Sequence, residues 1–90
     1  MVESKELTIK NKLGLHARAA AMLVKTTNSF QSEVYIEKDG QKVNGKSIMG
    51  VMMLAAAKGS TIKVEVSGPD AAALLARIED LVDDLFGEGE

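Results

Sequence analysis

The chain contains a single histidine, and the residues around it favour chemistry with an anion. Gly14 stands two residues before His16, Arg18 stands two residues after it, and a run of alanines begins at once. This pattern predicts that a helix starts at or beside His16, where unpaired backbone N–H groups and the positive end of the helix dipole favour an anion. A neutral imidazole nitrogen is a nucleophile, and a phosphoryl group attached to it would be an anion in that place. The spacing therefore predicts a histidine that accepts a phosphoryl group.

The alternative interpretation is a surface histidine that serves only as a helix cap. Leu13 and Leu15 favour the chemical interpretation, because apolar residues on both sides of Gly14 can pin the loop to the core and hold the imidazole. The helix dipole disfavours the imidazolium form, and the guanidinium of Arg18 can bind phosphoryl oxygens. The sequence has no cysteine, no second histidine, and no evident general base or metal cluster beside His16. It therefore predicts a carrier that depends on partner enzymes, without a metal or cofactor, rather than an enzyme.

Composition limits the class of protein. A chain of 90 residues with 46% apolar and 27% charged residues is typical of one soluble globular domain, here residues 1–90. A formal charge of −2 without a basic stripe argues against a nucleic-acid partner. No apolar run reaches the length of a membrane span, and the N-terminus lacks a signal-peptide pattern. The absence of cysteine fits a reducing compartment, so we expect a cytoplasmic protein with no membrane insertion.

Alternation of apolar and polar residues predicts strands at residues 6–10, 33–37 and 62–67. The pair Asp39-Gly40 is a hairpin signal and predicts a returning strand over residues 41–44. Strands that alternate so strictly need one dry face and one wet face, so the helices should cover only one side of the sheet. The predicted fold is an α+β two-layer sandwich.

Helical spacing predicts three helices, two between these strands and one after the last strand. The first two cover residues 17–28 and about 48–56, and the residues Ser67-Gly68-Pro69-Asp70 open the third. The third helix has an apolar stripe of Ala71, Leu74, Ile78, Leu81, Val82 and Leu85. Its acidic C-terminal end opposes the helix dipole, and residues 87–90 are expected to fray.

The second helix offers two further candidates. Ser47 is a natural N-cap, and a phosphate at a helix start would alter the surface charge without unfolding the helix. The helix is too short to bury all four of its large side chains, which are Ile48, Met49, Met52 and Met53. Methionine is adaptable and recurs on surfaces that meet several partners, although filling the core is its more common role.

Residues 40–47 match the phosphate-binding P-loop pattern, with Gly40, Gly45, Lys46 and Ser47 in the required positions. Taken alone, the match suggests a nucleotide-binding enzyme that loses ATP binding on Lys46→Ala. The context opposes it, because residues 41–44 are expected to form a strand and 90 residues are too few for the usual parallel sheet. We therefore reject this interpretation.

Three motifs resemble the HPr family, the histidine-containing phosphocarriers of the bacterial phosphoenolpyruvate-dependent phosphotransferase system. They are Gly14 to Arg18, the segment VNGKSIMGVM at residues 43–52, and Ala57-Lys58-Gly59. The resemblance covers essentially the whole chain in the same element order. It implies an open-faced sandwich (βαββαβα) in which three helices cover one face of a four-stranded antiparallel sheet, and a monomer.

The resemblance also implies the roles of individual residues. Enzyme I would phosphorylate His16 at Nδ1, Arg18 would help to bind and release the phosphoryl group, and an enzyme IIA would receive it. Ser47 matches the regulatory serine of HPr kinase/phosphorylase. The partner-docking patch would consist of Ala17, Ala21, Lys25, Ile48, Met49 and Met52.

The chain departs from the family pattern in one place, and two questions stay open. Ala19 stands where the family usually has proline, which leaves the loop rigidity and the transfer rate in doubt. The alternative function is a regulatory adaptor of the same fold, of the nitrogen-branch or catabolite-control type. Sequence does not identify the sugar or pathway served, because that specificity belongs to other components.

Overall fold

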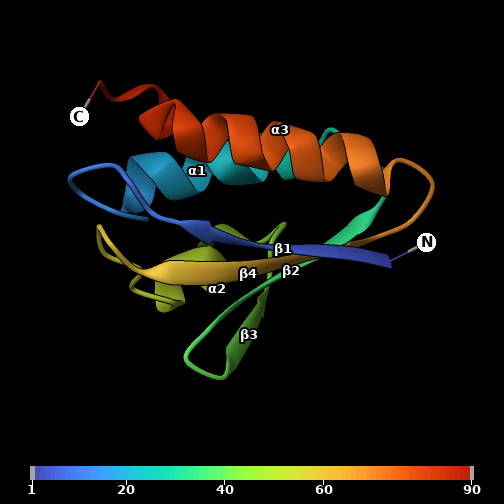
Figure 1. Ribbon diagram of the computed structural model, residues 1–90, viewed down its shortest axis with the longest axis horizontal. Coiled ribbons are helices and arrows are strands. Elements are labelled where there is room, and N and C mark those ends of the chain that lie inside the picture. The colour runs from blue at the N-terminus through green and yellow to red at the C-terminus, as the bar shows by residue number, and fades with distance from the viewer. Residues whose placement is uncertain (1, 90) are drawn as a thin grey trace.

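The computed structural model describes residues 2–89, and its elements follow the predicted order (Figure 1). Four strands form one antiparallel sheet in the order β1-β4-β2-β3. The strands are β1 (Val2–Thr8), β2 (Glu33–Lys38), β3 (Gln41–Asn44) and β4 (Thr61–Ser67). The helices are α1 (Ala17–Thr27), α2 (Ile48–Met53) and α3 (Ala71–Asp83), followed by the short turn η1 (Leu85–Gly87). The predicted α+β sandwich is confirmed.

The sheet has one dry face, as its alternating strands require. On β4, three residues are fully buried and their neighbours Thr61 and Lys63 are exposed; the buried residues are Ile62, Val64 and Val66. Figure 1 shows α1 and α3 side by side across the sheet, and their apolar stripes complete the core. Each buried aliphatic side chain stabilises the fold by about 1.5–3 kcal/mol. This core provides the rigid base from which the loops project.

The hairpin between β2 and β3 confirms the turn predicted from Asp39-Gly40. Lys38 pairs with Gln41, so the loop has two residues, and both have positive φ, 51° at Asp39 and 82° at Gly40. Two consecutive positive φ angles are what a type I′ hairpin turn needs.

The helix ends differ from the prediction in two places. Helix α2 ends at Met53 rather than near residue 56, because Leu54 caps it and Ala55 then enters the left-handed region at φ 48°. The stripe of α3 stops at Val82, and Leu85 is only half-buried. Beyond α3 the backbone turns left-handed, and Phe86, which sequence patterning did not assign to the core, is buried instead.

Candidate functional site

The loop before α1 holds His16 by its backbone. Leu15 is buried and its N–H donates to the carbonyl of Ala56 at 2.9 Å. Gly14 has φ +66°, and a Cβ there would lie 2.3 Å from the same carbonyl oxygen, so only glycine fits. Leu13, expected to pin the loop with Leu15, is instead 66% exposed. One leucine and one glycine therefore hold the loop, and the second leucine faces solvent beside His16.

His16 is the N-cap residue of α1, as the sequence predicted. Its backbone is extended at φ −74° and ψ −179°, and its carbonyl accepts the first helical bond from Ala20 N–H at 2.8 Å. Its side chain makes no cap hydrogen bond. Helix geometry leaves the N–H groups of Ala17, Arg18 and Ala19 without an intrahelical acceptor. His16 therefore occupies the N-cap position without capping the helix through its side chain, and the helix start remains open to an anion.

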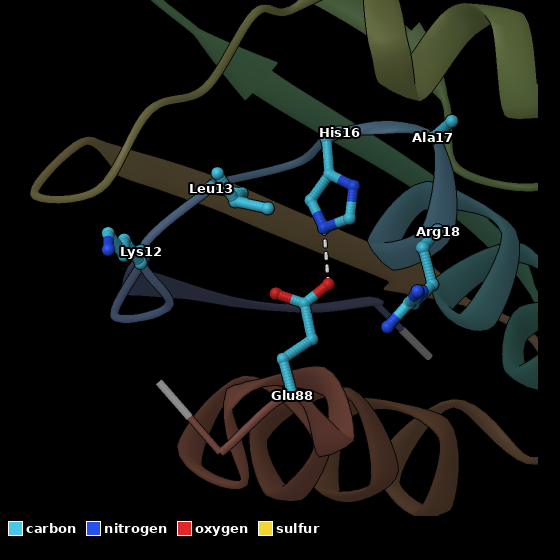
Figure 2. Close-up of a pocket in the computed structure, with 6 residues that line it drawn as sticks. All are labelled: Lys12, Leu13, His16, Ala17, Arg18 and Glu88. Atoms are coloured by element: carbon cyan, nitrogen blue, oxygen red, sulfur yellow. Dashed lines mark hydrogen bonds and ion pairs between the residues drawn. The ribbon is translucent and has the colours of Figure 1, made fainter.

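The imidazole is instead bonded to the far end of the chain. Nε2 of His16 and a carboxylate oxygen of Glu88 form a short hydrogen bond (Figure 2). The other Glu88 oxygen accepts from Nδ2 of Asn11 at 2.8 Å, and the same amide group donates to the carbonyl of Gly14 at 2.8 Å. The Glu88 side chain is only 10% exposed. The expected fraying is therefore not seen at Gly87 and Glu88, which are both hydrogen-bonded, and residue 90 lies outside the described residues.

The environment of Glu88 keeps its carboxyl ionised. Burial raises the pKa of Glu88, but hydrogen bonds from Asn11 and His16 and the nearby charge of Arg18 outweigh this effect and lower the pKa below its ordinary value. Sequence reasoning missed this carboxylate, which lies 72 residues beyond His16. No spacing rule could have connected two residues so far apart.

A surface pocket collects these groups, and its lining is Lys12, Leu13, His16, Ala17, Arg18 and Glu88. It combines two basic side chains, the start of α1 and one carboxylate. Figure 2 shows Nδ1 of His16 on the side of the ring away from Glu88. No hydrogen bond to Nδ1 is seen within residues 2–89. The arrangement therefore presents a nucleophilic nitrogen next to donors for an anion.

Ser47 caps α2, as the sequence predicted. Its hydroxyl oxygen accepts from Gly50 N–H at 3.1 Å, and the residue is half-buried. Beside it lie large exposed apolar side chains at 41–76% exposure, which are Ile48, Met49, Met52 and Met53. The three α1 residues assigned to the docking patch, Ala17, Ala21 and Lys25, are also exposed. A shallow pocket joins Met52 to His16 and Leu13, so Leu13 extends the patch predicted from sequence.

The P-loop match has no phosphate cradle. Residues 41–44 form β3, and Gly45 N–H donates to the carbonyl of Val34 at 2.8 Å. The ammonium of Lys46 donates to the carbonyl of Phe30 at 2.9 Å. The lysine and loop of the motif are thus engaged in tertiary hydrogen bonds.

Residues 2–89 contain neither a metal site nor a membrane-spanning helix. No cluster of three or more histidine, cysteine, aspartate or glutamate side chains in this part of the chain could hold a metal ion. In the same residues, no helix is both long and apolar enough to span a bilayer.

Comparison with known proteins gives consistent matches along the chain. Residues 3–84 match the family model PTS-HPr, described as "PTS HPr component phosphorylation site". Phosphocarrier protein HPr of Neisseria meningitidis is 52% identical over 93% of this chain and 94% of its own length. The crystal structure of HPr-C-His from Thermoanaerobacter tengcongensis superposes with a TM-score of 0.92 at 43% identity, covering 96% of this chain and 97% of that one. The crystal structure of an HPr dimer from the same organism superposes with a TM-score of 0.78 at 45% identity, covering 91% of this chain and 94% of that one.

Proposed function

Because the chain belongs to the HPr family of phosphotransferase-system components, we propose that it carries a phosphoryl group on His16. Phosphorylated enzyme I is the donor and an enzyme IIA is the acceptor. One observation supports this most strongly: the side chain of His16 is withheld from capping α1, so the nucleophile and the unpaired N–H groups of the helix start share one pocket. The chain is a carrier and depends on both partners for turnover.

Each transfer exchanges one bond to phosphorus for another. The Nδ1 lone pair of His16 forms a bond to phosphorus, while the donor's bond to phosphorus breaks and its electron pair stays on the donor. The N–H groups of Ala17 and Arg18 and the Arg18 guanidinium supply donors for the phosphoryl oxygens. The second transfer reverses these roles, with His16 as the leaving group. Ala19 is fully buried in the first turn, so its effect on the rate would come through the backbone.

Partners would dock on the exposed surface formed by Leu13, Ala17, Ala21, Lys25, Ile48, Met49 and Met52. Leu13, Ala17 and Met52 of this patch line pockets that include His16, so a docked partner would exclude water from the reacting nitrogen. We propose that the protein works in the cytoplasm. Its working form is a monomer, because a second copy bound here would compete with enzyme I. Size-exclusion chromatography with light scattering tests the monomer, and a stable dimer would contradict it.

Ser47 would provide regulation by HPr kinase/phosphorylase. Its half-buried hydroxyl lies at the start of α2, within the docking patch, so a phosphate there would add charge to an apolar contact surface. The regulatory adaptor is the second candidate function, favoured by this placement of Ser47. It predicts partner binding through the α2 surface with little phosphoryl transfer.

Intact-mass spectrometry after incubation with phosphoenolpyruvate, magnesium and enzyme I tests the proposal. We expect a single acid-labile phosphoryl adduct on the wild type and none on His16→Ala. No adduct with an enzyme I shown to be active on another HPr would favour the adaptor. Incubation with ATP and the kinase, with Ser47→Ala as control, would then show whether Ser47 is modified.

A further inference from the structure

The turn after α3 directs Glu88 into the His16 pocket through an unfavourable backbone conformation. Leu85 and Phe86 have φ of 56° and 53°, and Gly87 has 74°. A left-handed conformation costs about 1–2 kcal/mol for a residue other than glycine. Burial of Phe86, which is 1% exposed, offsets this cost and anchors the turn two residues before Glu88. The side chain of Glu88 is therefore placed by the core rather than by chance contact of a loose tail.

Asn11 holds the carboxylate from the other side. Asn11 is fully buried, and its NH₂ group faces two acceptors, the Glu88 carboxylate and the Gly14 carbonyl. Its Oδ1 has no hydrogen-bond partner within residues 2–89. Turning the Asn11 amide over would place Oδ1, an acceptor, against the Glu88 carboxylate, which also only accepts. The two hydrogen bonds of the NH₂ group therefore fix the orientation of the amide. Both oxygens of Glu88 are thus engaged, one by Asn11 and one by His16.

This arrangement decides which nitrogen of His16 is free. An ionised carboxylate can only accept a hydrogen bond, so the Nε2 atom facing Glu88 must be the donor. A neutral imidazole with its proton on Nε2 has its lone pair on Nδ1. Nδ1 faces away from Glu88 (Figure 2).

We propose that Glu88 is a positioning residue, which holds His16 in the Nε2–H form and leaves Nδ1 as the phosphoacceptor atom. The inference rests on the proposed function, because it concerns the same histidine. As the Nδ1–phosphorus bond forms, positive charge develops on the ring, and the carboxylate at Nε2 stabilises it. The aspartate of a Ser-His-Asp triad stabilises its imidazolium in the same way. Glu88 also covers Nε2 and so excludes phosphorylation there.

The competing interpretation gives Glu88 the opposite role, in which it hinders phosphorylation of His16. A carboxylate in the pocket repels an incoming phosphoryl group, so Glu88 could obstruct the site. Removing it would then accelerate transfer, whereas removal of a positioning residue slows transfer and relaxes the choice of nitrogen. The two interpretations therefore predict opposite changes in rate.

The first experiment uses phosphoramidate, which needs no partner protein. Its phosphorus–nitrogen bond breaks, ammonia leaves, and the phosphoryl group bonds to a ring nitrogen of His16. NMR of the ¹⁵N-labelled ring then identifies that nitrogen. We expect an adduct on Nδ1 alone in the wild type and on both nitrogens in Glu88→Ala. Glu6→Ala, which removes an exposed carboxylate from β1, is the matched control and should behave as wild type.

The second experiment measures phosphorylation by enzyme I. We expect Glu88→Ala to lower kcat by about 10- to 100-fold with little change in KM, which is the cost of losing the hydrogen-bond partner that orients a metal-binding histidine. Glu88→Gln should lie between, because its amide oxygen still accepts from Nε2–H but carries no charge. Faster phosphorylation of Glu88→Ala would overturn the proposal and identify Glu88 as an obstacle.

The proposal and the phosphocarrier function can fail separately. If Glu88→Ala matches the wild type in rate and in the nitrogen labelled, the positioning role is wrong and the carrier function stands. If neither phosphoramidate nor phosphorylated enzyme I labels the wild type, the carrier function is wrong. The Nε2 proton resonance then decides the positioning role: it should be protected from exchange in the wild type and lost in Glu88→Ala, and its absence from the wild type would overturn the proposal.

Discussion

The starts of helices α1 and α2 use their N-cap side chains in opposite ways. At α2, the Ser47 hydroxyl accepts from Gly50 N–H and satisfies the helix. At α1, the His16 side chain makes no such bond and turns to Glu88 instead. A satisfied helix start contributes stability, whereas an open one keeps its N–H donors for an arriving anion. One fold thus holds both a helix start that is capped by its own side chain and a helix start that is left uncapped.

Replacing His16 at the start of α1 by a residue that can cap the helix should have the largest effect on phosphorylation. We expect His16→Ser to abolish phosphorylation by enzyme I while making the protein about 1 kcal/mol more stable than His16→Ala, because serine can cap the helix and alanine cannot. Both variants lose the bond to Glu88, so that loss cancels between them. Intact-mass spectrometry and urea unfolding measure the two effects. Equal stability of the two variants would show that the start of α1 does not accept a cap.

The loop that withholds His16 from capping should be sensitive at Gly14. A Cβ at Gly14 would lie 2.3 Å from the Ala56 carbonyl oxygen, whereas one at Gly40 meets nothing within 4 Å. Both glycines have positive φ. We expect Gly40→Ala to cost about 1–2 kcal/mol of unfolding free energy, the backbone penalty alone, and Gly14→Ala to cost more. Urea unfolding compares them, and equal losses would mean that the loop adjusts without strain.

At α2, the cap and the proposed regulation can be separated by two substitutions. Ser47→Ala should lower the unfolding free energy by about 1 kcal/mol, because Gly50 N–H loses its acceptor. Ser47→Asp should retain most of that stability, since aspartate is a good N-cap, yet weaken enzyme I binding by placing a charge in the docking patch. Isothermal titration calorimetry with enzyme I measures the affinity. Equal affinity of wild type and Ser47→Asp would contradict the regulatory role.

The link from His16 to the C-terminal turn should give a small dependence of stability on pH. The pKa of Glu88 is lowered in the folded protein from an ordinary value of 4.5, so ionised Glu88 favours folding. This contribution is complete above pH 4.5 and is lost as pH falls through the lower folded value. The stability advantage of wild type over Glu88→Gln should therefore shrink on acidification, as urea unfolding at about pH 7 and about pH 3 would measure. A constant difference would show that Glu88 does not titrate differently in the two states.

Local patterns in the sequence were sufficient for the order of the elements and for His16, although the first strand, expected over residues 6–10, is β1 at Val2–Thr8. Alternating residues in β4, the Asp39-Gly40 turn and the two N-cap residues His16 and Ser47 each depend on neighbours within a few positions, and all are confirmed. The errors fall where the chain leaves a regular element. Leu13 was expected to be buried and is exposed, and helix α2 ends at Met53, earlier than expected.

What the sequence determined by itself was the α+β sandwich and the position of the one histidine at a helix start, because both rest on short-range periodicity and capping, and the family resemblance, which rests on three short motifs. Only the tertiary structure decided what the imidazole touches. Glu88 reaches His16 across 72 residues, supported by a left-handed turn and the buried Phe86. Read locally, the same tail of glycine and glutamate indicates a frayed end. Core packing overrides that local preference, since burial of Phe86 offsets the backbone cost of the turn that places the carboxylate.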